Sequence, residues 1–184
     1  MNTLPFSGVS VPGTSGPSQS ASAQWYALCT CSRHEKQVAA QLQQRAIEFL
    51  LPLYESVRRW KDRRVTLRLP LFPGYIFIHT SSQHRMDVLT IPGAARFVTF
   101  NGRPATLSET DLLGLRNGLE RGIHAQPHPY LTTGRRVRVR SGPLAGTEGI
   151  LLRKKDQLRL IVSIDMIMRS VAVEIDAADV EPIS

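Results

Sequence analysis

The side chains that could bind a metal or act in catalysis are few and poorly grouped. The two cysteines, Cys29 and Cys31, lie in a segment that alternates like a β-strand, so both point to one face. Neighbours of this kind rarely reach disulfide geometry, and two thiolates are too small a set for a structural zinc site. We therefore expect both residues to be buried free thiols in a reducing compartment.

The histidines give no clearer signal. His124 and His128 lie four positions apart, which would suit a metal on a helix, but Pro127 and Pro129 disfavour a helix there. No nucleophile elbow, phosphate loop or carboxylate pair with catalytic spacing stands out in the sequence. We expect no catalytic residue, no metal and no cofactor, and these observations argue against an enzyme.

A dense group of positive charges is the strongest chemical feature. Six cationic side chains fall within eleven positions, interleaved with Trp60 and relieved only by Asp62, in a chain of formal charge +8. The segment lies between two apolar ones, so it predicts a hairpin tip that contacts phosphates, with Trp60 stacking on a base. A solvated loop that only adds solubility is the alternative. The candidate nucleic-acid-binding residues are Arg58, Arg59, Trp60, Lys61, Arg63 and Arg64, and Arg68 completes the charged group.

The most apolar segment is LFPGYIFI at 71–78. Pro73 and Gly74 predict a sharp turn that leads into a strand. Alternation then places Tyr75 and Phe77 on one face of the strand, while two isoleucines lie on the other. Both faces of this strand are apolar. The face that does not pack on the core of its own sheet is therefore either buried or offered to a partner. A central core strand is the simpler interpretation.

The elements around this segment predict an α+β fold. Strands begin near residues 24, 48, 71 and 95, and helices cover 34–46 and 81–90. A further helix begins at Ser108, whose side chain can cap it, and ends at Gly122. We expect a mainly antiparallel sheet flanked by helices.

The carboxy-terminal part reads as all-β. Five short strands separated by turn residues follow residue 132 and predict a small SH3-like barrel. An apolar loop, IDMIM, is too hydrophobic for an ordinary surface turn, and both a core role and a binding role stay open for it. The predicted organisation is a disordered tail (1–23), a first domain (24–121), a flexible linker (122–131) and the barrel (132–184).

Several stretches carry a resemblance to a known family. LFPGYIFI together with Trp25-Tyr26 resembles the amino-terminal domain of NusG-type transcription elongation factors, and RVRVRSGPLAGTEGIL is similar to the KOW motif, with its glycine at Gly149. RFVTFNGRPATLSE is similar to the specialised RfaH and UpxY-type antiterminators, and the carboxy-terminal sequence points to the UpxY side.

The resemblance implies a set of binding residues. In this family the aromatic segment docks on the clamp helices of RNA polymerase, a short motif contacts its gate loop, and the KOW loops bind ribosomal protein S-ten or the termination factor Rho. The residues that match are Trp25, Tyr26, Phe72, Pro73, Tyr75 and Phe77 for the clamp helices, His84 and Arg85 for the gate loop, and Pro143, Leu144, Ala145, Met166 and Ile167 for the KOW loops. Upstream or non-template DNA is a further partner that the family implies for the basic hairpin.

The function expected on this basis is that of a non-enzymatic regulator. It would bind elongating RNA polymerase and suppress pausing or termination on selected operons. A housekeeping NusG that couples to Rho or the ribosome is the alternative within the family, and a ribosome-binding or RNA-binding KOW protein is the alternative from another class. The chain carries no apolar run long enough to span a membrane and no secretory signal, so we expect a cytoplasmic protein.

Overall fold

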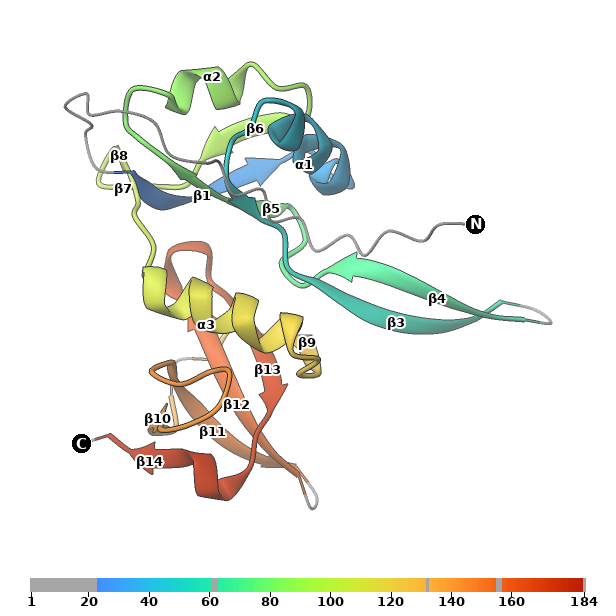
Figure 1. The fold of residues 1–184 in the computed structure, drawn as a ribbon, viewed down its shortest axis with the longest axis vertical. Helices are drawn as coiled ribbons and strands as arrows, with labels where there is room; N and C mark the ends of the chain where they lie inside the picture. The colour runs from blue at the N-terminus through green and yellow to red at the C-terminus, as the bar shows by residue number, and fades with distance from the viewer. Residues whose placement is uncertain (1–22, 61–62, 132, 155–156, 184) are drawn as a thin grey trace. The chain divides into compact units, whose positions relative to one another are not determined.

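The computed structural model describes residues 23–60, 63–131, 133–154 and 157–183 (Figure 1). Residues 1–22 of the predicted tail and Lys61 lie outside the described residues, as does the side chain of Trp60. The chain divides into two compact units, Met1–Leu51 with Gly74–Leu107 and Pro52–Pro73 with Ser108–Ser184. The units are described separately, and the domain boundaries drawn from the sequence stay predictions.

The first unit is an antiparallel sheet with two helices. The order of its four-stranded sheet is β2-β5-β1-β6, and a short β7-β8 hairpin follows it in the chain. This arrangement agrees with the antiparallel sheet and helices expected from the sequence. The elements are β1 (Gln24–Thr30), α1 (Glu35–Gln44), β2 (Phe49–Leu50), β5 (Tyr75–Thr80), α2 (Arg85–Leu89), β6 (Ala94–Phe97), β7 (Thr99–Phe100) and β8 (Arg103–Pro104).

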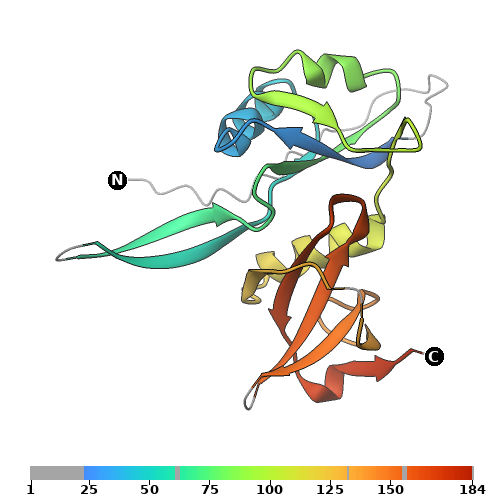
Figure 2. The same cartoon turned by 180° about the vertical axis from the view of Figure 1, so that it is seen from behind.

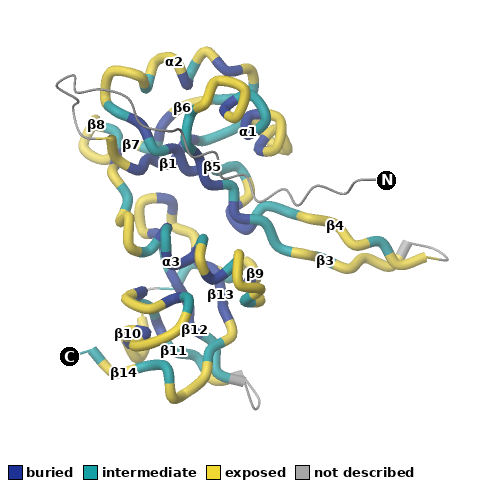
Figure 3. The backbone as a smooth tube through the Cα atoms, viewed as in Figure 1, coloured by how far each residue is buried: buried dark blue, intermediate teal, exposed yellow. Residues whose placement is uncertain are grey.

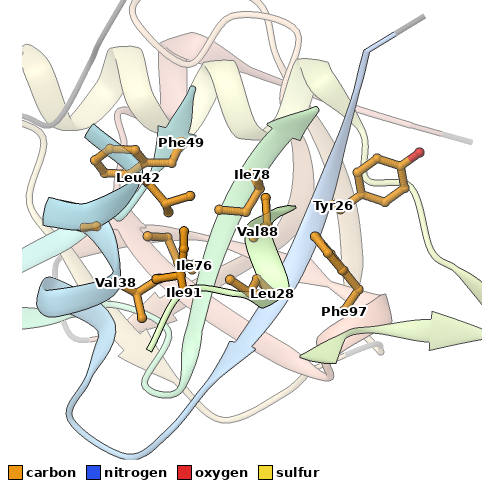
Figure 4. Packing of buried hydrophobic residues seen from close by; sticks show 11 residues of the cluster. Tyr26, Leu28, Val38, Leu42, Phe49, Ile76, Ile78, Val88, Ile91 and Phe97 are labelled. Atoms are coloured by element: carbon orange, nitrogen blue, oxygen red, sulfur yellow. The ribbon is translucent and has the colours of Figure 1, made fainter. Parts of the chain in front are cut away.

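One face of this sheet carries the hydrophobic core of the first unit. Val38 and Leu42, one turn apart on α1, and Val88 of α2 pack with Ile76 and Ile78 of β5 (Figure 4). The spacing of the α1 residues puts both on one side of the helix, as the sequence predicts. The remaining buried members of the cluster are Tyr26, Leu28, Ala39, Phe49, Ile91 and Phe97.

The second unit contains a long two-stranded ribbon. Its strands, β3 (Leu53–Trp60) and β4 (Arg63–Pro70), pair antiparallel along their whole length, from Leu53 opposite Pro70 to Trp60 opposite Arg63 (Figures 1 and 2). The sequence predicts a hairpin here. The arginines lie on the strands themselves rather than in a separate loop.

The second unit also holds α3 and a six-stranded antiparallel sheet in the order β14-β10-β11-β12-β13-β9. Five of these strands follow the predicted pattern, and whether they close into a barrel stays a prediction. The elements are α3 (Glu109–Glu120), β9 (Ala125–His128), β10 (Arg135–Val139), β11 (Glu148–Lys154), β12 (Gln157–Ile164), β13 (Arg169–Glu174) and β14 (Val180–Pro182), with 3-10 turns at Asp165–Ile167 and Ala177–Asp179.

The sixth strand corrects the linker prediction. Residues 122–131 were expected to form a flexible linker, but β9 lies within them and pairs with β13, with Ala125 opposite Val173. Pro127 lacks an N–H to donate, which an edge strand tolerates because one of its sides has no partner strand. The expectation of a flexible linker is therefore wrong for Ala125–His128.

Helix α3 begins and ends where the sequence predicts. The Ser108 side chain accepts a hydrogen bond from the Asp111 N–H at 3.3 Å, so it caps the first turn. Gly122 follows the helix with a φ of +80°, a conformation that glycine adopts without strain.

Gly149, the glycine of the KOW-like motif, is required by close strand packing. A methyl group at this position would lie 2.5 Å from the Ile161 carbonyl oxygen, which belongs to a backbone and cannot rotate away. We predict that Gly149→Ala lowers the free energy of unfolding by about 1–3 kcal/mol through this overlap, measured by chemical denaturation. Gln126→Ala, at an exposed position on β9, is the matched control and should change stability by less than about 0.5 kcal/mol. Equal stability of the two variants would contradict the packing argument.

Candidate binding surfaces

The face of the first sheet opposite the core cluster is the first candidate surface, and we call it the second face. Ala27 of β1 lies opposite Phe77 of β5, and Trp25 lies opposite His79, so these four side chains share that face. None of them belongs to the cluster that packs against α1 and α2. The structure therefore brings Trp25, Tyr75 and Phe77 together on one apolar face, as the alternation predicts.

The second face is not open in the structure, which corrects the expectation of an uncovered aromatic surface. Only 3% of Trp25 and 0% of Phe77 is exposed. Both side chains lie on inner strands of the sheet. Leu50 and Ala27 flank Phe77, and the His79 ring stacks on Trp25 with centroids 5.0 Å apart.

Among the other residues predicted for the clamp helices, exposure varies along the chain (Figure 3). Tyr26 and Phe72 are buried, and Tyr26 belongs to the core cluster on the opposite face from Trp25. Pro73 is exposed and Tyr75 is half-buried. The accessible part of the predicted set is therefore the turn at Pro73 and the start of β5.

A buried carboxylate holds this turn, and sequence reasoning missed it. The Glu35 side chain, at the start of α1, accepts a hydrogen bond from the Gly74 N–H at 2.7 Å. Gly74 has a φ of +83°, as its place after Pro73 predicts. Glu35 is 6% exposed although it carries a charge. In the sequence, Glu35 is an acidic residue in the first turn of an amphipathic helix, which is common. Only the fold shows that its partner is the Gly74 N–H.

We predict that Glu35→Ala destabilises the protein by about 1.5–3 kcal/mol, because the Gly74 N–H loses a charged acceptor. Glu35→Gln keeps an acceptor oxygen of similar reach and should cost less. Thermal unfolding of both variants provides the comparison. Two variants with the same midpoint as the unmodified chain would show that the hydrogen bond does not hold the turn.

The residues predicted for the gate loop lie at the start of α2. The ring Nδ1 of His84 lies 3.1 Å from an Asp87 carboxylate oxygen, and the Arg85 guanidinium lies over the Tyr26 ring, 5.3 Å from its centroid. Met86, the next residue in α2, is 69% exposed. His84, Arg85 and Met86 therefore form an accessible patch of mixed polarity.

The cysteines differ from each other more than the sequence suggests. Cys29 is half-buried within β1, but Cys31 lies beyond the last strand residue and is exposed, so the expectation of two buried thiols is wrong for Cys31. Both are free. Burial raises the pKa of the Cys29 thiol, and the nearby Arg96 guanidinium partly offsets this effect.

We predict that Cys31 reacts first with a thiol reagent, because Cys29 is less accessible and holds less thiolate at a given pH. Ellman's reagent should give a fast and a slow phase with the native protein. Cys31→Ser should abolish the fast phase, and Cys29→Ser the slow one. A fast phase that survives Cys31→Ser would contradict the assignment of Cys31 as the more accessible thiol.

The basic ribbon is the second candidate surface. Arg58, Arg59, Arg63 and Arg64 are all exposed. The strand register places Arg59 directly opposite Arg64, with Arg58 opposite Val65. The structure thus brings four of the predicted nucleic-acid-binding residues together at one end of the ribbon.

The third candidate surface is the loop between β10 and β11, which holds the predicted KOW residues. Pro143 is half-buried and Ala145 exposed, whereas Leu144 is buried with 2% of its surface exposed. A methyl group at Gly118 of α3 would lie 2.8 Å from Leu144 Cδ2, so the helix packs closely on this loop. In the structure, Leu144 therefore packs against α3 and is not accessible to a partner.

Close packing continues one helical turn earlier on α3. A methyl group at Gly114 would overlap the Thr147 hydroxyl oxygen. That oxygen is buried and has no hydrogen-bond partner within the described part of the chain. Sequence reasoning did not single out these two glycines.

The IDMIM loop is divided between core and surface. Ile167 is buried, Met166 is 39% exposed, and Met168 adopts a left-handed conformation with a φ of +49°. Asp165 of this loop accepts a hydrogen bond from the Tyr130 hydroxyl at 3.0 Å. The core interpretation therefore applies to Ile167, and a binding role for the exposed methionines stays a prediction.

No group of three or more histidine, cysteine or acidic side chains among the described residues could hold a metal ion. Within the same residues, no helix combines the length and apolar character that crossing a membrane would require.

The family model and the similar proteins found by comparison point to the same family. The model of a family described as "Transcription termination factor nusG" matches residues 23–116. The chain is 27% identical over 180 aligned residues to the transcription termination/antitermination protein NusG of Escherichia coli K12, and the alignment covers 89% of this chain and 98% of the relative. It is 25% identical over 174 residues to the protein of that name from Helicobacter pylori J99, with 86% and 98% covered.

Solved structures include a similar chain described as "Domain interaction in Thermotoga maritima NusG". It has a TM-score of 0.49 and 21% sequence identity, and the match covers 88% of this chain and 98% of that one.

Proposed function

The chain belongs to the NusG family of transcription factors, and from that premise we propose that it binds transcribing RNA polymerase and suppresses pausing or termination on selected operons. The proposal assigns it to the specialised antiterminators of the RfaH and UpxY kind. The sequence RFVTFNGRPATLSE, which the fold places around the β7-β8 hairpin, supports that assignment.

The observation that carries the proposal is the apolar second face of the first sheet. Helices α1 and α2 pack against the other face, and the second face gathers Trp25, Ala27 and Phe77 from two adjacent strands. Once accessible, an apolar face of this kind would suit the docking of a protein helix or helical hairpin such as the polymerase clamp helices. Because Trp25 and Phe77 are buried, docking on this face requires both rings to become accessible.

The accessible edge of that face gives the first contact in this proposal. Pro73 is exposed and Tyr75 half-buried, on a turn that the Glu35 hydrogen bond holds in place. His84 and Arg85 provide a separate polar contact to the polymerase. A turn held in one conformation loses little entropy on binding, which favours its use as an anchor.

The KOW loop and the IDMIM loop are proposed to bind a second partner, such as ribosomal protein S-ten or Rho. Pro143, Ala145 and Met166 are accessible for this contact, whereas Leu144 and Ile167 are buried. Binding through Leu144 would require α3 to leave the loop, because Gly118 packs against that side chain.

A housekeeping role, with coupling to Rho or the ribosome, is the second candidate. The alignments that span 98% of proteins named for both termination and antitermination favour it. The two candidates predict opposite effects at a Rho-dependent terminator, so one assay separates them.

The test is transcription in vitro with purified bacterial RNA polymerase over a template that carries a pause site and a terminator. The full-length chain should shorten the pause and raise read-through. Reduced read-through in the presence of Rho would instead support the housekeeping role. If neither pausing nor termination changes, the proposed function is wrong.

A substitution at the accessible edge tests the docking face. We predict that Tyr75→Ala weakens polymerase binding and the effect on pausing roughly tenfold or more, as expected for an aromatic anchor. Tyr75 is preferable to Phe77, because truncating a fully buried phenylalanine would cost about 3–5 kcal/mol of stability. The control is Phe100→Ala, which removes an aromatic ring that is 62% exposed on β7. Wild-type binding by a folded Tyr75→Ala variant would eliminate this face as the docking site.

A further inference from the structure

We propose that the His79 ring is a movable cover over Trp25 and that the Glu48 carboxylate holds this cover closed. The inference rests on the proposed function, because it names what controls a partner's access to the second face. It gives His79 and Glu48 a positioning role: the docking surface becomes complete only when the His79 ring swings away from Trp25.

His79 covers Trp25 by direct stacking. The two residues lie opposite each other on β5 and β1. Their rings are stacked, with centroids 5.0 Å apart and an angle of 25° between the planes. Trp25 is 3% exposed, whereas the His79 side chain keeps 27% of its surface exposed. His79 is therefore the outer ring of the pair, and its movement would open one face of the indole.

Glu48, the residue before β2, fixes the position of the His79 ring. The ring Nδ1 lies 2.7 Å from a carboxylate oxygen of Glu48. An ionised carboxylate only accepts hydrogen bonds, so Nδ1 carries the hydrogen of this bond. A second bond joins the main chains, in which the His79 N–H donates to the Glu48 carbonyl oxygen at 3.0 Å. Because the main-chain bond holds the strands together, the ring can leave without unfolding the sheet.

The side-chain hydrogen bond is suited to reversible opening. Both of its side chains are half-buried, so water can take the place of each partner when the bond breaks. The net contribution of such a bond is modest, and its loss shifts a two-state equilibrium by roughly five- to tenfold. A closed state favoured by this margin covers Trp25 in the free chain and still opens when a partner binds the exposed ring.

The place of His79 on the second face puts it in the path of a docking helix. Tyr75, Phe77 and His79 alternate along β5 and so share this face. At about 3.3 Å per residue, Tyr75 and His79 are roughly 13 Å apart, which corresponds to about two turns of an α-helix. A helix anchored at Tyr75 and running along β5 therefore reaches His79, with Trp25 beneath it.

The first experiment measures access to Trp25 in the free chain. The sequence contains two tryptophans, so Trp60→Phe leaves Trp25 as the source of the tryptophan fluorescence, which acrylamide quenches according to its accessibility. In this background, Glu48→Ala should raise the quenching constant roughly threefold or more, because the open state becomes more populated. His79→Ala, which removes the cover itself, should raise it at least as much.

Two control variants separate the cover from a general loosening of the fold. Glu48→Gln keeps an acceptor oxygen for the His79 Nδ1 and should stay near the native quenching constant. Asp87→Ala removes the carboxylate from a second histidine pair, in which the His84 Nδ1 lies 3.1 Å from the Asp87 oxygen, and should leave Trp25 quenching unchanged. Circular dichroism and thermal unfolding establish that each variant is folded.

The second experiment measures the association of the same variants with purified bacterial RNA polymerase. When only the open state binds, the apparent affinity is lowered in proportion to the open fraction. Glu48→Ala should therefore associate faster than the native chain, by a factor similar to its rise in quenching. Glu48→Gln should associate at the native rate.

Several outcomes would overturn the inference. Equal quenching of the native chain and Glu48→Ala would do so, as would an equal rise for Asp87→Ala. A rise in quenching without faster association would show that opening of the cover does not control docking. If no variant binds polymerase at all, the proposed function is wrong, and the quenching series alone decides whether Glu48 holds His79 closed.

Discussion

Much of the first unit depends on one constraint. A β-sheet has two faces, and the layer formed by α1 and α2 can cover only one of them. Strands β1 and β5 are apolar on both faces, and the core cluster with α1 and α2 accounts for only one of them. The alternation along both strands and their register thus leave Trp25, Ala27 and Phe77 on the face opposite the core cluster. The proposed docking on the clamp helices begins from that second apolar face, which is buried in the structure.

The local signals in the sequence were sufficient for most elements. The alternation of β1, the four-residue spacing on α1 and the Ser108 cap of α3 each depend on residues within one turn or one strand, so the chain carries them directly. The Asn101-Gly102 turn is of the same kind, since both residues have positive φ. Sequence patterns that lie within one turn or one strand can be recognised without knowing the tertiary structure.

Features that depend on distant neighbours could not be predicted in the same way. The pairing of β9 with β13 joins residues far apart in the chain, and Pro127 masked it because proline usually marks the absence of a strand. The burial of Trp25 and Phe77 is a property of the folded chain, and the partner of Glu35 lies on a turn in another segment. For the candidate surfaces, the sequence therefore supplied residue types and faces but not accessibility.

The glycines of α3 have a practical consequence. Leu144 lies against Gly118, and no bulkier residue could take that place without a shift of the loop. A fragment that begins after Gly122 would lose this cover and leave Leu144 in contact with water. Such a fragment would be prone to self-associate, so its sedimentation or diffusion should depend on concentration more strongly than that of the full-length chain. Studies of the carboxy-terminal sheet in isolation should therefore retain α3.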